Sequence, residues 1–281
     1  PKPAHFPPLE MAFTIENLPD RLSALLKNHD RGAAFVSALL TATLDYAAAR
    51  APEIADSPEQ IDRAMQLGFS WEIGPFALSR SLKGETSAGA SYLRNQRVIR
   101  ANPGASLRDL GDGVACLEFH SKMNTIGGDI ISLLFESLEE VRANFEGLVI
   151  GNQGNHFSAG ANLMLLMMEA AEGNWDEIDH MVRTFQRATQ AIRYSPKPVV
   201  VAPFGLTLGG GCEIALAGAK VQAAAETYIG LVEVGGGLMP AGGGATEMLR
   251  RSCGEGSRKV REVFENIGLA KVSTSAEDAR R

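Results

Sequence analysis

The first part of the chain carries apolar residues at helical spacing. Across residues 18–54, Leu and Ala recur every three or four positions, and Pro52 interrupts the pattern near its end. A second helical pattern occupies residues 58–69, with Ser57 at the N-cap position and a proline in the first turn. No cluster of acids, bases or nucleophiles accompanies these patterns. They predict a small all-helical domain over residues 1–84.

The pattern changes after residue 84. Residues 85–106 are polar, rich in Gly and Ser and of mixed charge, which predicts a linker. From residue 107 onward, short apolar runs typical of buried strands alternate with helical patterns, as in β-α-β units. The region 107–281 is therefore predicted to be an α/β domain. Its expected strands are a hairpin in 107–121 around Gly111, Asp112 and Gly113, and the runs 146–154 and 197–205; its expected helices are 127–145 and 174–195.

Composition and charge argue against several classes of function. A chain of 281 residues with 45% hydrophobic content can bury a sizeable core. Its net charge of -6 argues against a nucleic-acid partner, and neither nucleotide-binding glycine motif is present. Three cysteines without metal-ligand spacing fit a reducing compartment, so a cytoplasmic location is expected. We expect no membrane span, because no apolar run reaches roughly 18 to 20 residues.

Both ends of the sequence indicate a piece of a longer polypeptide. The chain begins at Pro1 without a methionine. Thr274 and Glu277 have the spacing of a capping box for a helix that ends after barely two turns, and so short a helix is marginal alone. The α/β domain is therefore expected to be truncated at its C-terminus.

Two glycine-bearing turns repeat one local design. The segment "HFSAGANL", with Gly160 at its centre, follows one predicted strand, and the triplet Gly209, Gly210, Gly211 follows the next. Each opens a helix-like run, where free N–H groups and the helix dipole favour negative charge. Two such donors facing one point form an oxyanion hole, worth about 2.7 to 4 kcal/mol per donor. The alternative is a tight strand-to-helix turn without a ligand.

Two glutamates accompany the second turn. Glu213 falls in the first turn of the helix that the triplet opens, and Glu233 follows after a further strand-like run. Each has a structural alternative, since Glu213 is favoured there by the helix dipole alone and Glu233 fits an ordinary loop carboxylate. Together with the two donor turns, they indicate an active site with paired carboxylates.

Three segments resemble the signature segments of the crotonase (enoyl-CoA hydratase/isomerase) superfamily. They are "HFSAGANL", "GLTLGGGCEIALAGA" and "YIGLVEVGGGLMPAGGG", in the family's order and with its spacing between the glutamates. The resemblance covers roughly residues 107–281 and implies a crotonase-like ββα spiral with an acyl-CoA thioester as substrate. It implies an oxyanion hole at Ala161 and Gly210, catalytic roles for Glu213 and Glu233, and substrate contacts at Ser121, Met123, Ala159, Asn162 and Leu163.

The reaction implied by the resemblance is addition of water to a 2-enoyl-CoA, giving a 3-hydroxyacyl-CoA. The N–H groups of Ala161 and Gly210 would stabilise the enolate oxygen. Glu213 would activate the water for attack at C3, and Glu233 would protonate C2. Isomerases of this family usually keep only the later glutamate, so the presence of both favours hydration. The sequence departs from the family at Asn162, where an aspartate is frequent.

The first region carries a second resemblance. "LGFSWEIGPFALS", residues 67–79, resembles the end of the helical C-terminal domain of 3-hydroxyacyl-CoA dehydrogenases. The two resemblances in this order imply a fused protein of fatty-acid β-oxidation. The NAD-binding domain of such a protein is absent from this sequence, so we expect neither a cofactor nor dehydrogenase activity here. A further possible partner is another copy of the same chain, in a homo-oligomer.

Three other features have two interpretations each. The apolar run 163–168 fits an acyl tunnel or, as the favoured interpretation, the core face of a helix. Cys212 beside Glu213 lacks a base, which favours a packed thiol over a nucleophile. No metal site is expected, because His120, His156 and His180 do not have the spacing of metal ligands on one helix.

Three functional hypotheses follow. The favoured one is an enoyl-CoA hydratase. The second, on the same fold, is a double-bond isomerase or a thioester hydrolase. The third is a non-catalytic scaffold fragment of a larger multifunctional protein.

Overall fold

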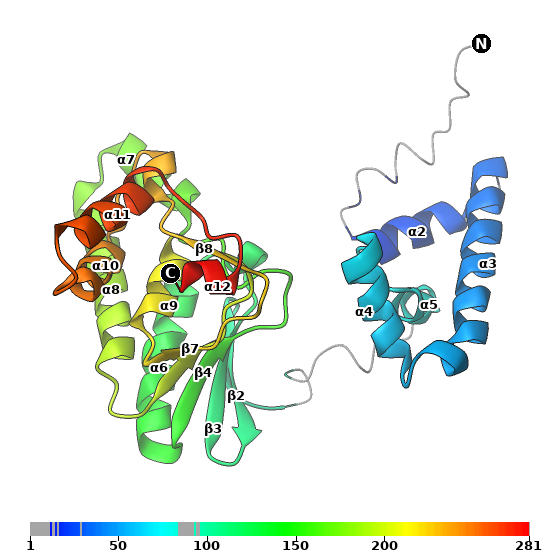
Figure 1. The fold of residues 1–281 in the computed structure, drawn as a ribbon, viewed down its shortest axis with the longest axis horizontal. Coiled ribbons are helices and arrows are strands. Elements are labelled where there is room, and N and C mark those ends of the chain that lie inside the picture. The colour runs from blue at the N-terminus through cyan, green and yellow to red at the C-terminus, as the bar shows by residue number, and fades with distance from the viewer. Residues whose placement is uncertain are drawn as a thin grey trace, which may run out of the picture. The chain divides into compact units, whose positions relative to one another are not determined.

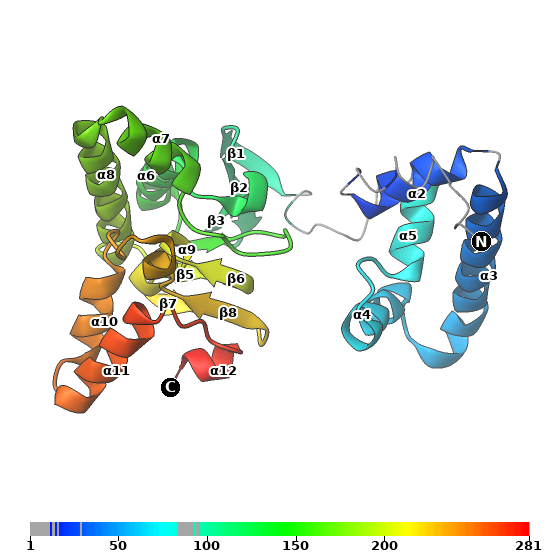
Figure 2. The ribbon, with the colours of Figure 1, turned by 90° about the horizontal axis from the view of Figure 1, so that it is seen from above.

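The computed structural model describes residues 12, 15, 17–28, 30–83, 93 and 96–280. The chain divides into two compact units, Pro1–Tyr92 and Leu93–Arg281. Figures 1 and 2 show the first unit in blue to cyan and the second in green to red.

Unit 1 is helical where the structure describes it. Its elements are α2 (Leu18–Leu26), α3 (Arg31–Ile54), α4 (Pro58–Phe69) and α5 (Pro75–Leu82). Ser57 occupies the N-cap of α4 as predicted, although its side chain makes no capping hydrogen bond. Pro52 does not break α3 but lies in its last turn, and the helix ends at Ile54. A proline there has no N–H for the carbonyl four residues earlier, and the helix continues for only two residues beyond it.

The Gly-Pro-Phe sequence of unit 1 is explained by Asp62. This carboxylate, buried in α4, accepts the N–H groups of Phe76 at 2.7 Å and Ala77 at 2.9 Å, so it caps α5 from a neighbouring helix. A β-carbon at Gly74 would lie 2.4 Å from the Asp62 β-carbon, so the chain passes too close for any side chain. Pro75 at the first helical position needs no N–H partner.

Helix α3 departs from one expectation. It has 24 residues and a mean hydropathy of 1.3, which its many alanines raise. By length and composition alone, this helix could cross a membrane. Among its described residues only Ala33 is buried. Helices of soluble proteins pass the same test, so this finding assigns no membrane role. Its exposed large apolar side chains are Phe35, Leu39, Tyr46 and Ile54.

Unit 2 is built on a six-stranded sheet within its described residues, in the order β1-β2-β3-β4-β5-β7. β1, β2 and β3 pair antiparallel, and β3, β4, β5 and β7 run parallel, as alternating strands and helices require. The strands are β1 (Arg97–Ala101), β2 (Ala105–Gly111), β3 (Val114–Phe119), β4 (Gly147–Gly151), β5 (Val199–Val201) and β7 (Lys220–Val221). The predicted α/β class and the hairpin at residues 111–113 are confirmed.

The predicted linker is wrong for residues 97–106. These residues form β1 and the beginning of β2. β1 lies at the edge of the sheet, and all of its side chains except Ile99 are exposed, so it shows no apolar alternation. The linker prediction for residues 85–92, 94 and 95 falls outside the described residues.

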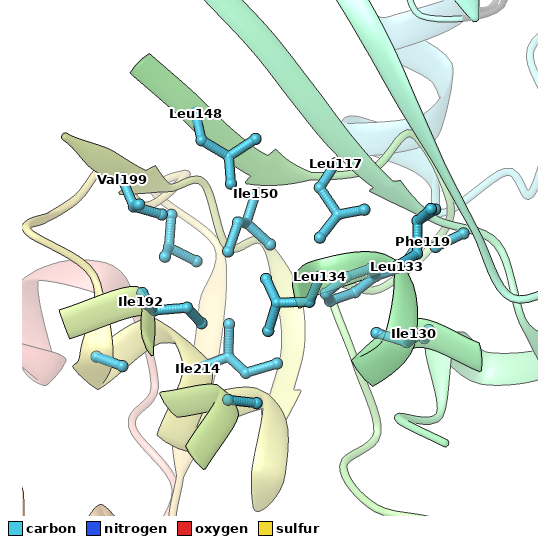
Figure 3. Packing of buried hydrophobic residues seen from close by; sticks show 14 of the residues in the cluster. Leu117, Phe119, Ile130, Leu133, Leu134, Leu148, Ile150, Ile192, Val199 and Ile214 are labelled. Carbon is cyan, nitrogen blue, oxygen red and sulfur yellow. The ribbon is translucent and has the colours of Figure 1, made fainter. Parts of the chain in front are cut away.

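Helices α6 (Gly128–Asn144), α8 (Trp175–Arg193) and α9 (Gly210–Ala217) bury their apolar faces with the sheet. In Figure 3, side chains from three strands meet α6 at Leu133 and Leu134, α8 at Ile192 and α9 at Ile214. Close packing of this kind holds the sheet and α9 in one rigid body. The strand side chains in the view are Leu117, Phe119, Leu148, Ile150 and Val199.

The remaining elements surround the ends of these strands. β6 (Gly205–Leu208) and β8 (Thr227–Gly230) form a small parallel sheet, seen side by side in Figure 2. The other elements are η2 (Lys122–Asn124), α7 (Leu163–Glu172), η3 (Glu233–Gly236), α10 (Gly244–Ser252), α11 (Ser257–Gly268) and α12 (Ala276–Ala279). The cap of α12 is Ser275, one residue after the predicted Thr274, and it accepts the Asp278 N–H at 3.1 Å.

Candidate active site

The first glycine turn joins β4 to α7. Gly160 adopts a φ of 98°, which favours glycine, and a β-carbon there would lie 2.9 Å from the Leu208 carbonyl oxygen. Its own carbonyl accepts the Ile126 N–H at 2.8 Å. The turn is therefore fixed between η2 and β6, and it presents the N–H of the next residue, Ala161.

The second glycine turn joins β6 to α9 and lies against the first. A β-carbon at Gly210 would lie 3.5 Å from the Ala161 nitrogen, and one at Gly160 would lie 3.4 Å from the Gly210 nitrogen. Within the described residues, neither the Ala161 N–H nor the Gly210 N–H donates a hydrogen bond. Two unsatisfied donors thus lie side by side, one of them at a helix N-terminus.

Glu213 lies in the first turn of α9 and is 4% exposed. Its Oε1 accepts the Gly244 N–H at 2.8 Å, which places the carboxyl group at the N-terminus of α10. Burial raises the pKa of Glu213 to about 7, and the negative charge of Glu233 adds to the rise, while the N–H groups of Gly244 and Gly242 oppose it. Near neutral pH, Glu213 therefore has both of its protonation states within reach.

Glu233 begins η3, directly after the loop that follows β8. Its Oε1 would lie 3.4 Å from a β-carbon at Gly209, so the carboxyl group approaches the turn that carries Gly210. Both carboxyl oxygens are buried and have no hydrogen-bond partner among the described residues. Burial raises the pKa of Glu233 above its usual range. A buried carboxyl group without a partner is costly, which marks it as a group kept for a ligand.

The predicted substrate contacts fall around the first turn. Ser121 precedes η2, and its hydroxyl donates to the Thr125 carbonyl at 2.9 Å, just after the end of η2. Met123 has a φ of 55° and is half exposed, and its carbonyl accepts the Ala159 N–H at 3.1 Å. Asn162 caps α7 by accepting the Leu165 N–H at 3.3 Å. Leu163 follows it and is 47% exposed.

The favoured interpretation of residues 163–168 as a core helix face is wrong. α7 has no buried residue within its described length. Leu163, Met164, Met167 and Met168 are all largely exposed. Periodicity identified the helix but could not show that its apolar side chains stay largely exposed to solvent.

The structure adds groups that the sequence did not indicate. Phe185 of α8 would lie 3.2 Å from a β-carbon at Gly210, so its ring packs behind the donor turn. Gly244 supplies the N–H that holds Glu213. The sequence signal for Gly244 is the glycine triplet at residues 242–244, which ends the third signature segment and by itself indicates no contact with Glu213.

The thiol of Cys212 is buried, and burial raises its pKa far above the usual range, with Glu233 and Glu213 adding to the rise. A thiol held in its neutral form is a poor nucleophile, so packing is its role here. No group of three or more His, Cys, Asp or Glu side chains within the described residues is arranged to hold a metal ion.

Residues 109–280 match the sequence pattern of the family described as Enoyl-CoA hydratase/isomerase. The chain belongs to this family. Among solved structures, an enoyl-CoA hydratase from Bacillus anthracis is 26% identical and superposes with a TM-score of 0.54 over 63% of this chain and 66% of that one. The crotonase fold predicted from the three segments is confirmed.

Longer relatives cover both units. A Bacillus subtilis protein named "Probable 3-hydroxyacyl-CoA dehydrogenase" is 40% identical over 98% of this chain and 42% of its own length. A Rickettsia felis protein named "Putative fatty acid oxidation complex trifunctional enzyme" is 29% identical over 84% of this chain and 37% of its own length. The chain thus spans about two fifths of these relatives, and the resemblance of its helical part to a dehydrogenase is supported.

Proposed function

We propose that this crotonase-family chain adds water to 2-enoyl-CoA thioesters, giving 3-hydroxyacyl-CoA, as the hydratase part of a fused hydratase/3-hydroxyacyl-CoA dehydrogenase of β-oxidation. The observation that carries the proposal is the meeting of two unpaired N–H groups and two buried carboxyl groups around Gly209 and Gly210. Family membership supports the substrate class, and the names of the longer relatives support the fused context.

The two N–H groups would bind the thioester carbonyl oxygen. As water adds to C3, negative charge moves onto this oxygen, and donors that are already oriented stabilise it without reorganising. The Ala161 and Gly210 nitrogens are close enough to share one acceptor, because each lies within 3.5 Å of a β-carbon placed on the other turn. Gly210 is the first residue of α9, so the helix dipole adds to the attraction at this donor.

The two carboxyl groups would divide the acid and base roles. Burial raises the pKa of each, and the negative charge of Glu233 raises that of Glu213 further, so Glu213 can change its protonation state near neutral pH. In the proposed reaction, Glu213 reacts in its ionised form and takes a proton from the water whose oxygen bonds to C3. Glu233 reacts in its protonated form and gives its proton to C2. One water is consumed, and the addition is redox-neutral, so the reaction uses no NAD.

Hydration is tested by the loss of enoyl-thioester absorbance with crotonyl-CoA. Glu213→Gln and Glu233→Gln are each expected to lower turnover at least about 100-fold, the usual contribution of a general acid or base. Glu226→Gln, which changes an exposed glutamate in the same unit, is the control and should keep full activity. Full turnover in either site variant contradicts the assigned roles. Release of free CoA would instead identify a hydrolase, and a shifted double bond would identify an isomerase.

A further inference from the structure

Ser158 lies at the junction between the two donor turns and is fully buried. Its N–H donates to the Leu206 carbonyl at 3.1 Å, and its carbonyl accepts the Leu208 N–H at 3.0 Å. These bonds attach the first turn to β6, the strand that leads directly into the second turn. Ser158 therefore belongs to the first turn, and its backbone hydrogen bonds join that turn to the strand that precedes the second turn.

The Ser158 hydroxyl is fully engaged. It donates to the Asn124 carbonyl at 2.8 Å and accepts the Gly160 N–H at 3.1 Å. Asn124 is itself held, because its side-chain amide donates to the His156 carbonyl at 2.9 Å. The hydroxyl thus ties η2 to the Ala159–Gly160 peptide, which is one peptide before the one that carries the Ala161 N–H. Hydrogen bonds inside a buried network of this kind restrict orientation more than an exposed bond does.

The Ser158 side chain also touches α9. A β-carbon at Gly211 would lie 2.7 Å from the Ser158 β-carbon, so the first turn of the helix rests directly on this residue. One side chain therefore contacts the supports of both donors. Shifting it would change the direction of the Ala161 N–H relative to that of Gly210.

We propose that Ser158 is a positioning residue whose hydroxyl orients the Ala161 N–H for the oxyanion. This inference rests on the proposed hydration. Loss of a donor in an oxyanion hole costs on the order of 100- to 1,000-fold in rate, and misdirection of a donor that is still present costs less. We expect Ser158→Ala to lower kcat about 10- to 100-fold with little change in KM, since the effect is largest where charge develops.

Thr207 offers a matched control. It is also fully buried and stands beside Ser158 in the bridge between the first turn and β6, yet its hydroxyl has no hydrogen-bond partner among the described residues. Thr207→Val removes a hydroxyl of similar burial without breaking a bond. It should leave kcat unchanged, whereas Ser158→Cys, which keeps a weaker donor and acceptor, should fall between Ser158→Ala and the parent.

The deciding experiment binds cinnamoyl-CoA, whose absorption moves to longer wavelength when hydrogen bonds polarise its thioester carbonyl. The parent chain and Thr207→Val should give the same shift, and Ser158→Ala a smaller one, with urea unfolding confirming that each variant is folded. If Ser158→Ala does not fold, the absorption shift of cinnamoyl-CoA bound to Ser158→Cys decides instead. A parent shift that persists fully in the Ser158 variants overturns the positioning role alone. A parent chain that gives no shift overturns the proposed function together with it.

Discussion

The raised pKa of Glu213 makes a quantitative prediction about stability. In the folded chain its pKa is about 7, against 4.5 for an unperturbed glutamate. A raised carboxyl pKa stabilises the fold below the unfolded value, and that contribution is lost as the pH rises through the folded value. Between pH 5 and pH 8.5, this one group should lower the free energy of unfolding by about 2.5 kcal/mol. Glu213→Gln, which stays neutral, escapes this loss.

The assay is urea unfolding of unit 2, followed by Trp175 fluorescence in a Trp71→Phe background so that unit 1 contributes no tryptophan signal. The stability of Glu213→Gln relative to the parent should rise by about 2.5 kcal/mol over this pH range. Titratable groups that do not interact with residue 213 cancel in the difference.

Glu247→Gln is the matched control, because Glu247 is a buried glutamate whose pKa is lowered and not raised. Burial by itself raises its pKa, but hydrogen bonds from Arg250 and Arg251 hold that pKa below its usual range. Its stabilising contribution is present above the unfolded value and is lost only as the pH falls through the folded one. Glu247→Gln should therefore be destabilised by a nearly constant amount from pH 5 to 8.5. A Glu213→Gln difference that is equally constant would refute the reasoning.

Three further predictions follow from the same geometry. Asp62→Ala removes the cap of α5 and should cost unit 1 about 1 to 2 kcal/mol by urea unfolding followed at Trp71; an unchanged midpoint would contradict the capping role. Gly160→Ala forces a side chain to a φ of 98° and against the Leu208 carbonyl, so crotonyl-CoA turnover and the midpoint of unit 2 should both fall, and retention of both would show that the turn is not constrained. The plot of kcat against pH should be bell-shaped, because hydration needs one proton on the glutamate pair, and a profile flat from pH 5 to 9 would exclude that requirement.

Much of unit 2 could be predicted because its signals are local. The turn at residues 111–113 and the apolar runs 146–154 and 197–205 are local signals, and the structure confirms the hairpin and places β4 and β5 within these runs. β6, which runs directly into the second glycine turn, was not predicted. β1 was missed because an edge strand with exposed side chains has no apolar alternation. Helix α7 was placed but misassigned to the core, since exposure depends on what packs against a helix and not on its period.

The candidate site, too, could be predicted only in part from the sequence. The glutamates and donor turns could be proposed because their spacing along the chain is itself the signal. The support of Glu213 by Gly244, and of the first turn by Ser158, depends on contacts between segments 31 and 34 residues apart. No local pattern reports such contacts, so these residues became visible only in three dimensions.

The most direct test of the central claim is mass analysis of the product formed from crotonyl-CoA in ¹⁸O-labelled deuterated water. Hydration predicts an intact CoA thioester that has gained one solvent oxygen at C3 and one solvent deuteron at C2, with formation abolished by Glu213→Gln and Glu233→Gln. Unlabelled substrate, a product with a moved double bond and no ¹⁸O, or solvent oxygen found in a free acid would contradict hydration.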